Sequence, residues 1–134
     1  MNIKIDNPAT NWSAEATILV VEDEPIVRML VVDQLDDLGF RTVEAQDASE
    51  ALALLRRGDR FDLMLTDVGL PGMDGRELAE VARGLQPDLK VLFATGYSGS
   101  DTSALGLPAR GMDLVGKPIE MDELARRIRL LLEG

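Results

Sequence analysis

Short apolar runs alternate with longer amphipathic segments along most of this chain, and this alternation limits the possible folds more than any other feature. Residues 17–21 (Thr-Ile-Leu-Val-Val) are too few for a helix and lack polar alternation, as expected of a parallel strand buried on both faces. Four further short strands are predicted at 41–45, 63–66, 90–94 and 114–115. The alternation predicts an α/β domain with a five-stranded parallel sheet and right-handed crossovers.

Helical spacing of apolar residues fills the intervals between the first strands. Pro25 suits the first turn of a helix, and the apolar stripe that follows it stops at Gly39. The stripe consists of Ile26, Val27, Leu30, Val31, Leu35 and Leu38. Asp47 and Glu50 resemble a capping box at the start of a second helix, which should end at Gly58.

Two more helices follow the same spacing, and a fifth is weakly indicated. Residues 78–85 should form a helix closed by Gly84 and Pro87, and residues 121–132 a final helix with acids in its first turn. Residues 96–111 contain four Gly and a Pro, so any helix there should be short and weak.

Composition excludes several classes of function. The 134 residues suit one domain, and the absence of Cys and His excludes disulfides, thiolate or imidazole metal sites and catalytic triads with a His base. A net charge of −10 argues against direct nucleic-acid or anionic membrane binding.

Residues 1–16 lack a signal-peptide pattern, so we expect a cytoplasmic protein. They read as a flexible extension or weakly docked arm, with Trp12 as an anchor, preceding a domain over 17–134.

Polar residues follow four of the five predicted strands. In open parallel sheets, sites form outside the carboxyl ends of the strands. The residues at these ends are Glu22, Asp23 and Glu24, then Asp67, then Thr95 and Gly96, then Lys117 and Pro118. Each alone is commonly a helix cap, a turn or a solvated charge. Their convergence on one edge of the sheet favours a functional site.

The residue types at this edge suit phosphoryl transfer. Close carboxylates repel one another unless they share a cation, and the oxygens of Glu22, Asp23 and Asp67 suit Mg²⁺ or Mn²⁺. Lys117 could bind phosphoryl oxygens as a point charge, and Thr95 could donate its hydroxyl. Without Cys or His, the central carboxylate of Asp67 is the predicted nucleophile, forming an acyl phosphate.

The order and spacing of these motifs resemble a response-regulator receiver domain of two-component signalling. The matching motifs are Val-Val-Glu22-Asp23-Glu24-Pro, Leu-Thr-Asp67-Val-Gly-Leu-Pro71-Gly-Met-Asp-Gly75, Phe-Ala-Thr95-Gly and Gly-Lys117-Pro118. The resemblance implies a flavodoxin-like doubly wound (βα)5 fold with strand order 2-1-3-4-5. It also implies a partnership with a sensor histidine kinase or phosphotransfer protein as donor, and with a downstream protein partner. The only catalysis implied is phosphorylation and dephosphorylation of the chain itself.

The resemblance also assigns a role to each residue. It implies that Asp67 is the phosphoacceptor, that Asp23 binds Mg²⁺ directly and that Glu22 acts through metal-bound water. The backbone carbonyl of Gly69 is the implied third protein ligand. Thr95 and Lys117 match the phosphate-sensing hydroxyl and Lys, in a receiver subclass with a Phe-Ala-Thr-Gly loop, as in single-domain or hybrid-kinase receivers. The implied Lys117–Pro118 bond is cis.

One departure concerns the switch that would report phosphorylation. Leu114 stands where receivers commonly have Tyr or Phe, so the usual coupled movement of a hydroxyl and an aromatic ring is not expected. We expect phosphorylation to order residues 96–111 instead, and Tyr97 to shield the acyl phosphate.

Two other functions compete with a receiver. One is a Mg²⁺-dependent phosphatase of the haloacid-dehalogenase type, but such enzymes carry a second Asp two residues after the nucleophile, where this chain has Gly69. The other is a receiver fold used only as a constitutive binding module. The intact acid cluster argues against that module. Measured Mg²⁺ binding would distinguish a phosphorylated receiver from a constitutive binding module.

Overall fold

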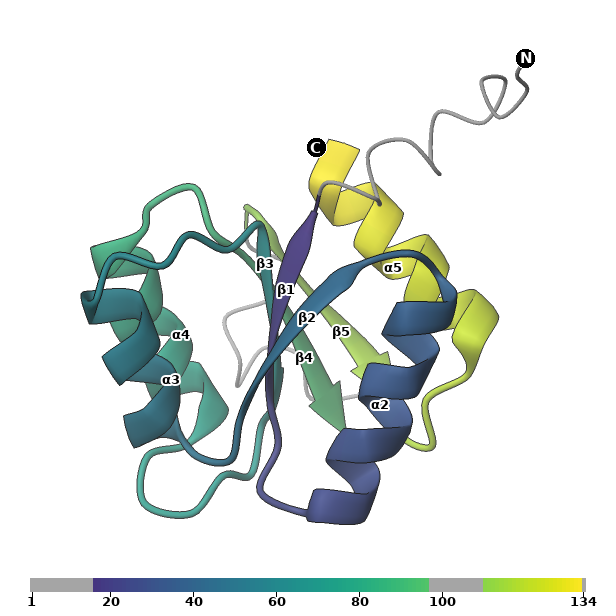
Figure 1. The fold of residues 1–134 in the computed structure, drawn as a ribbon, viewed down its shortest axis with the longest axis horizontal. Helices are drawn as coiled ribbons and strands as arrows, with labels where there is room; N and C mark the ends of the chain where they lie inside the picture. The colour runs from purple at the N-terminus through teal and green to yellow at the C-terminus, as the bar shows by residue number, and fades with distance from the viewer. Residues whose placement is uncertain (1–15, 97–109, 134) are drawn as a thin grey trace.

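The computed structural model describes residues 16–96 and 110–133, which form one parallel sheet with helices on both faces (Figure 1). The strands are β1 (Thr17–Val21), β2 (Arg41–Ala45), β3 (Leu63–Asp67), β4 (Lys90–Thr95) and β5 (Met112–Gly116). Their order is β2-β1-β3-β4-β5, and every pairing is parallel. The predicted fold class and strand order are confirmed.

Four helices lie in the described residues, two on each face of the sheet. Helices α2 (Pro25–Asp37) and α5 (Met121–Glu133) cover one face, and α3 (Ala48–Arg56) and α4 (Gly75–Leu85) cover the other (Figure 1). Each face has its own apolar core, because side chains of successive strand residues alternate between the faces. Ile18 and Val20 pack on the α2 and α5 side, whereas Leu19 and Val21 pack on the α3 and α4 side.

The predicted arm at 1–16 lies outside the described residues except for Ala16, and the weak helix within 96–111 lies outside them except at its ends. None of the helices in the described ranges is long and apolar enough to cross a membrane.

Helix ends follow local hydrogen bonding, and here one sequence prediction needs correction. The Asp47 carboxylate caps α3 by accepting from the Glu50 N–H, but Glu50 Oε1 accepts from the Gln46 N–H, so the capping box is incomplete. Helix α4 ends at Leu85, the last residue of the predicted stripe, between Gly84 and Pro87.

Helix α2 buries less of its apolar stripe than the sequence pattern suggests. Val31 and Leu35 are buried, but Ile26 and Leu30 are 68% and 55% exposed, and Met29 beside them is 54% exposed. The helix therefore touches the sheet along a narrow seam and leaves an apolar strip uncovered at its N-terminal half.

Candidate functional site

The carboxyl ends of β1, β3, β4 and β5 meet at one edge of the sheet, as the parallel register requires. The residue pairs nearest this edge are Val21–Thr66, Asp67–Ala94 and Thr95–Gly116. Glu22 and Lys117 follow β1 and β5 directly. The structure thus brings all the strand-end residues predicted from the sequence to the same edge.

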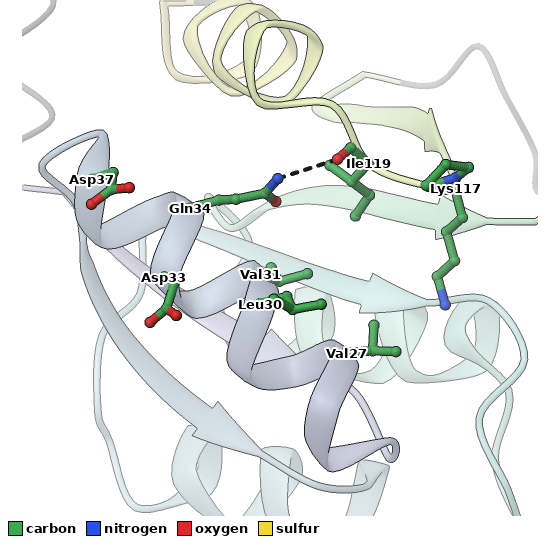
Figure 2. Close-up of a pocket in the computed structure, with 9 residues that line it drawn as sticks. Val27, Leu30, Val31, Asp33, Gln34, Asp37, Lys117 and Ile119 are labelled. Carbon is green, nitrogen blue, oxygen red and sulfur yellow. Dashed lines mark hydrogen bonds between the residues drawn. The ribbon is translucent and has the colours of Figure 1, made fainter.

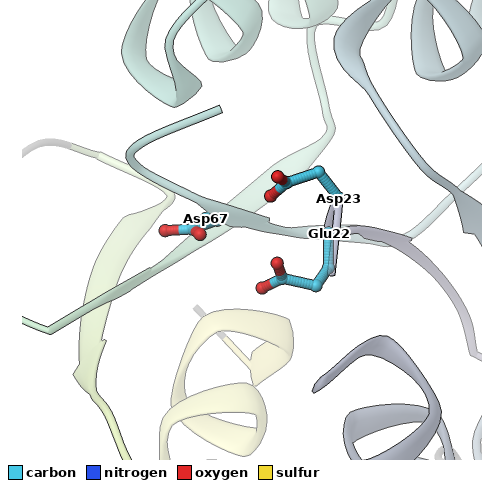
Figure 3. Close-up of side chains that lie close together, drawn as sticks. All are labelled: Glu22, Asp23 and Asp67. Atoms are coloured by element: carbon cyan, nitrogen blue, oxygen red, sulfur yellow. The ribbon is translucent and has the colours of Figure 1, made fainter. Parts of the chain in front are cut away.

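Three acidic side chains gather there (Figure 3). Glu22, Asp23 and Asp67 each offer a carboxylate oxygen, and these oxygens all lie within 4.8 Å of one another. Glu22 is only 5% exposed, whereas Asp23 and Asp67 are half-buried. Three carboxylates this close repel one another in the absence of a cation, and their hard oxygens suit a small divalent ion.

Lys117 contributes a cation to the same cluster. Its Nζ lies 3.0 Å from Asp67 Oδ2 and 3.3 Å from Glu22 Oε1. Burial of the ammonium lowers the pKa of Lys117, but its hydrogen bonds to Asp67 and Glu22 and their charges outweigh this, and the pKa is raised. Lys117 is therefore charged at neutral pH, and it bridges Glu22, which follows β1, and Asp67, which ends β3.

Glu22 is under electrostatic strain in this arrangement. Burial raises the pKa of its carboxyl, and the nearby Asp67 charge raises it further, although the Glu24 N–H at 3.1 Å and the Lys117 ammonium lower it. The direction of this pKa means that the Glu24 N–H and Lys117 together do not offset the burial of the carboxylate. A divalent cation would add to the stabilisation that they give the charged form.

Thr95 and Gly69 complete the surroundings of Asp67. Thr95 is buried at the end of β4, and its carbonyl accepts a hydrogen bond of 2.8 Å from the Lys117 N–H. The Gly69 N–H lies 3.3 Å from Asp67 Oδ1. The Lys117–Pro118 peptide bond is cis, as the resemblance implied. Tyr97 lies outside the described residues.

Leu114 packs, partly buried, against the apolar core on the α3 and α4 side of the sheet. It lies beside the fully buried Phe93 of β4. The Leu114 side chain has no polar atom and packs among apolar residues, so it offers no group that could report the state of Asp67. The predicted ordering of residues 96–111 falls mostly outside the described residues and stays a prediction.

Gly75, at the start of α4, lies against the backbone of Asp67. Its N–H donates to the Val68 carbonyl at 2.8 Å, and a Cβ built on Gly75 would collide with the Asp67 carbonyl oxygen. Any side chain here would push the Asp67 backbone out of place, because the obstructing atoms belong to the main chain. The sequence motif contained Gly75 but did not indicate this contact.

We expect Gly75→Ala to lower the free energy of unfolding by about 2 kcal/mol, the typical cost of overpacking. Gly84→Ala is the matched control, since a Cβ at Gly84 meets nothing within 4 Å. That control should raise stability by about 0.5 kcal/mol or more through helix propensity. Urea unfolding of both variants measures the difference, and equal stabilities would contradict the close approach.

An apolar groove adjoins the site between α2 and the segment that follows β5 (Figure 2). Its volume is about 620 Å³. The lining residues are Val27, Leu30, Val31, Asp33, Gln34, Asp37, Lys117, Pro118 and Ile119. Gln34 Nε2 donates to the Ile119 carbonyl at 3.2 Å across the groove. The groove therefore leads from the exposed strip of α2 to Lys117.

The fold and this edge of the sheet define a class of protein. Residues 18–129 match the sequence model of the response regulator receiver domain. The chain belongs to this family, whose members are signalling domains of two-component phosphorelays.

Individual proteins of known class are similar to this chain in sequence and structure. The chain is 38% identical over 127 residues to the sensor kinase CckA of Brucella abortus, covering 93% of this chain but 13% of that kinase. It is 31% identical to the response regulator receiver protein CpdR of Brucella abortus, covering 86% of this chain and 95% of CpdR. The response regulator TrrA from Thermotoga maritima, solved in complex with Mg²⁺-BeF, is 32% identical with a TM-score of 0.76, covering 87% of this chain and 99% of TrrA.

Proposed function

We propose that this receiver accepts a phosphoryl group on Asp67 from a phosphohistidine of a sensor histidine kinase or phosphotransfer protein. A carboxylate oxygen of Asp67 attacks phosphorus, the phosphorus–nitrogen bond breaks, and the departing imidazole takes up a proton. The observation that carries the proposal is the position of Asp67, within 3.0 Å of the Lys117 ammonium and beside two further acids. Labelling by acetyl phosphate, measured as intact mass, tests it.

We also infer a cytoplasmic location and a receiver unit over 17–134.

The acidic cluster fits Mg²⁺, with Mn²⁺ as the alternative hard cation. Asp23, Asp67 and the Gly69 carbonyl would hold the ion, and Glu22 would act through bound water. When bound, the ion supplies positive charge that offsets the negative charge of the incoming phosphoryl group. The raised pKa of Glu22, caused by burial and by the Asp67 charge, supports a site that favours an added cation.

Lys117 and Thr95 would stabilise the phosphoryl group once it is transferred. The Lys117 ammonium bonds to Asp67 and can move its hydrogen bonds to phosphoryl oxygens, since the flexible stem of Lys allows this. Thr95 stands at the end of the neighbouring strand, where its hydroxyl could donate to another of these oxygens.

The competing functions predict different measurements. A phosphatase of the haloacid-dehalogenase type needs a second carboxyl two residues after the nucleophile, and Gly69 offers none. A constitutive binding module would not need Mg²⁺. Turnover of a phosphate monoester would favour the first, and absence of Mg²⁺ binding would favour the second.

The uncovered strip of α2 is positioned to receive the phosphodonor protein, since a donor histidine must approach Asp67 over this edge. Leu30→Asp would place a charge in the lining of the groove, where an apolar partner surface would have to desolvate it. We expect transfer from a phosphorylated histidine phosphotransfer protein to slow by about tenfold or more. Labelling by acetyl phosphate should be unchanged.

The matched control for this prediction is Leu85→Asp, because Leu85 is 41% exposed on α4, on the opposite face of the sheet. The donor should be chosen from phosphotransfer proteins that label the wild type. Equal slowing in both variants, or slowing with acetyl phosphate as well, would contradict docking at the groove.

A further inference from the structure

Arg28 connects three elements next to the acidic cluster. Its backbone N–H donates to the Glu24 carbonyl in the first turn of α2. Its side chain folds back, so that Nη1 donates to the Glu22 carbonyl oxygen at 2.7 Å and Nε donates to Glu44 Oε1 at 3.1 Å. The Arg28 side chain is 18% exposed. The end of β1, the start of α2 and the edge strand β2 are thus joined through one guanidinium.

The bond to the Glu22 carbonyl fixes the peptide unit that leads into Asp23. Ala45 accepts from the Glu22 N–H at 3.1 Å on the other side, so the Glu22 backbone is held at both of its polar groups. The Asp23 carboxylate itself makes no hydrogen bond or ion pair with any residue in 16–96 or 110–133. Its direction therefore depends on the backbone that Arg28 holds.

An ordinary surface ion pair would not explain this arrangement. Arg57 and Asp59 form such a pair two residues apart in one loop. Pairs of that kind contribute about 0–1 kcal/mol to stability and position nothing else. Arg28 differs because one of its two bonds is to the main chain next to a proposed metal ligand, and the other anchors the guanidinium on a separate strand.

We propose that Arg28, anchored by Glu44, is a positioning residue that sets the affinity of the acidic cluster for Mg²⁺. This rests on the proposed function, since it assumes that Asp23 binds the ion. Groups that orient metal ligands typically change affinity by about tenfold or more when removed. The positive charge of Arg28 would act in the opposite direction by repelling the ion, but Glu44 offsets that charge, so the positional effect should prevail.

Calorimetric titration of the full chain with Mg²⁺ tests this, using Arg28→Met, Arg28→Lys and Glu44→Gln, with Arg57→Met as the matched control. We expect Arg28→Met to weaken Mg²⁺ binding by about tenfold, and Glu44→Gln by less. Arg28→Lys should restore part of the affinity, because Lys keeps the charge and one donor. At saturating Mg²⁺, labelling by acetyl phosphate should stay within about twofold of the wild type.

The alternatives give distinct results. Tighter Mg²⁺ binding by Arg28→Met would show that charge, and not position, dominates. A lower melting temperature with unchanged Mg²⁺ affinity would show a purely structural role. Either result overturns the proposal. If Arg28→Met does not fold, Arg28→Lys decides the matter, because it keeps the positive charge, and a wild-type Mg²⁺ affinity in that variant would also contradict positioning by the guanidinium. Absence of Mg²⁺ binding by the wild type would instead reject the proposed function on which the inference rests.

Discussion

Asp67→Asn should abolish the gain of a phosphoryl group when the protein is incubated with acetyl phosphate and Mg²⁺. The substitution keeps the size of the side chain, but an amide is not a nucleophile under these conditions and cannot form an acyl phosphate. It also removes one of three clustered charges, so the folded protein should remain intact. Intact-mass measurement reports the labelling, and circular dichroism reports the fold.

Asp88→Asn is the control for this substitution, because Asp88 is an exposed acid in the turn before β4. It should be labelled like the wild type. Stable labelling of Asp67→Asn at the wild-type level would mean that the phosphoacceptor lies elsewhere.

Asp23→Ala should weaken Mg²⁺ binding by about 100-fold, and Glu22→Ala by about tenfold. The difference follows from the proposed roles, in which Asp23 binds the ion directly and Glu22 acts through water. Glu22 also holds Lys117 at 3.3 Å, so its loss should let the ammonium pair more fully with Asp67. Calorimetric titration measures both affinities.

Glu24→Ala is the matched control for these two acids. Glu24 neighbours both in sequence but is exposed, and its side chain makes no capping bond at the start of α2. Its removal should change the affinity by no more than about twofold. A larger loss for Glu22→Ala than for Asp23→Ala would reverse the assigned roles.

The sequence predicted the sheet well where burial alone determines a strand. Val20 and Val21 of β1 are buried because helices cover both faces, so the apolar run was a sufficient signal. Strand β5 was predicted only at 114–115, although it runs over Met112–Gly116. Asp113 obscured it, since a charged residue is unusual in a parallel strand. Its charge is paired with Arg127 of α5 at 2.9 Å, a contact between elements that no local pattern reveals.

The candidate site was predictable for a related reason. Parallel strands deliver the residues after their carboxyl ends to one edge, so Glu22, Asp67 and Lys117 could be brought together from strand positions alone. Arg28 was missed because its partners are a carbonyl group and a carboxylate on another strand. Gly75 was missed because its role is a close backbone contact, which depends on the path of the turn after β3.

The central claim is tested most directly by the mass of the wild-type chain after incubation with acetyl phosphate, in Mg²⁺ or in excess EDTA, followed by peptide mapping. We expect a single added phosphoryl group in Mg²⁺, little in EDTA, and the label on the peptide that contains Asp67, because the clustered carboxylates need a cation before they admit another anion. Equal labelling in EDTA, or a label on a peptide that lacks Asp67, would contradict Mg²⁺-dependent phosphorylation of this residue.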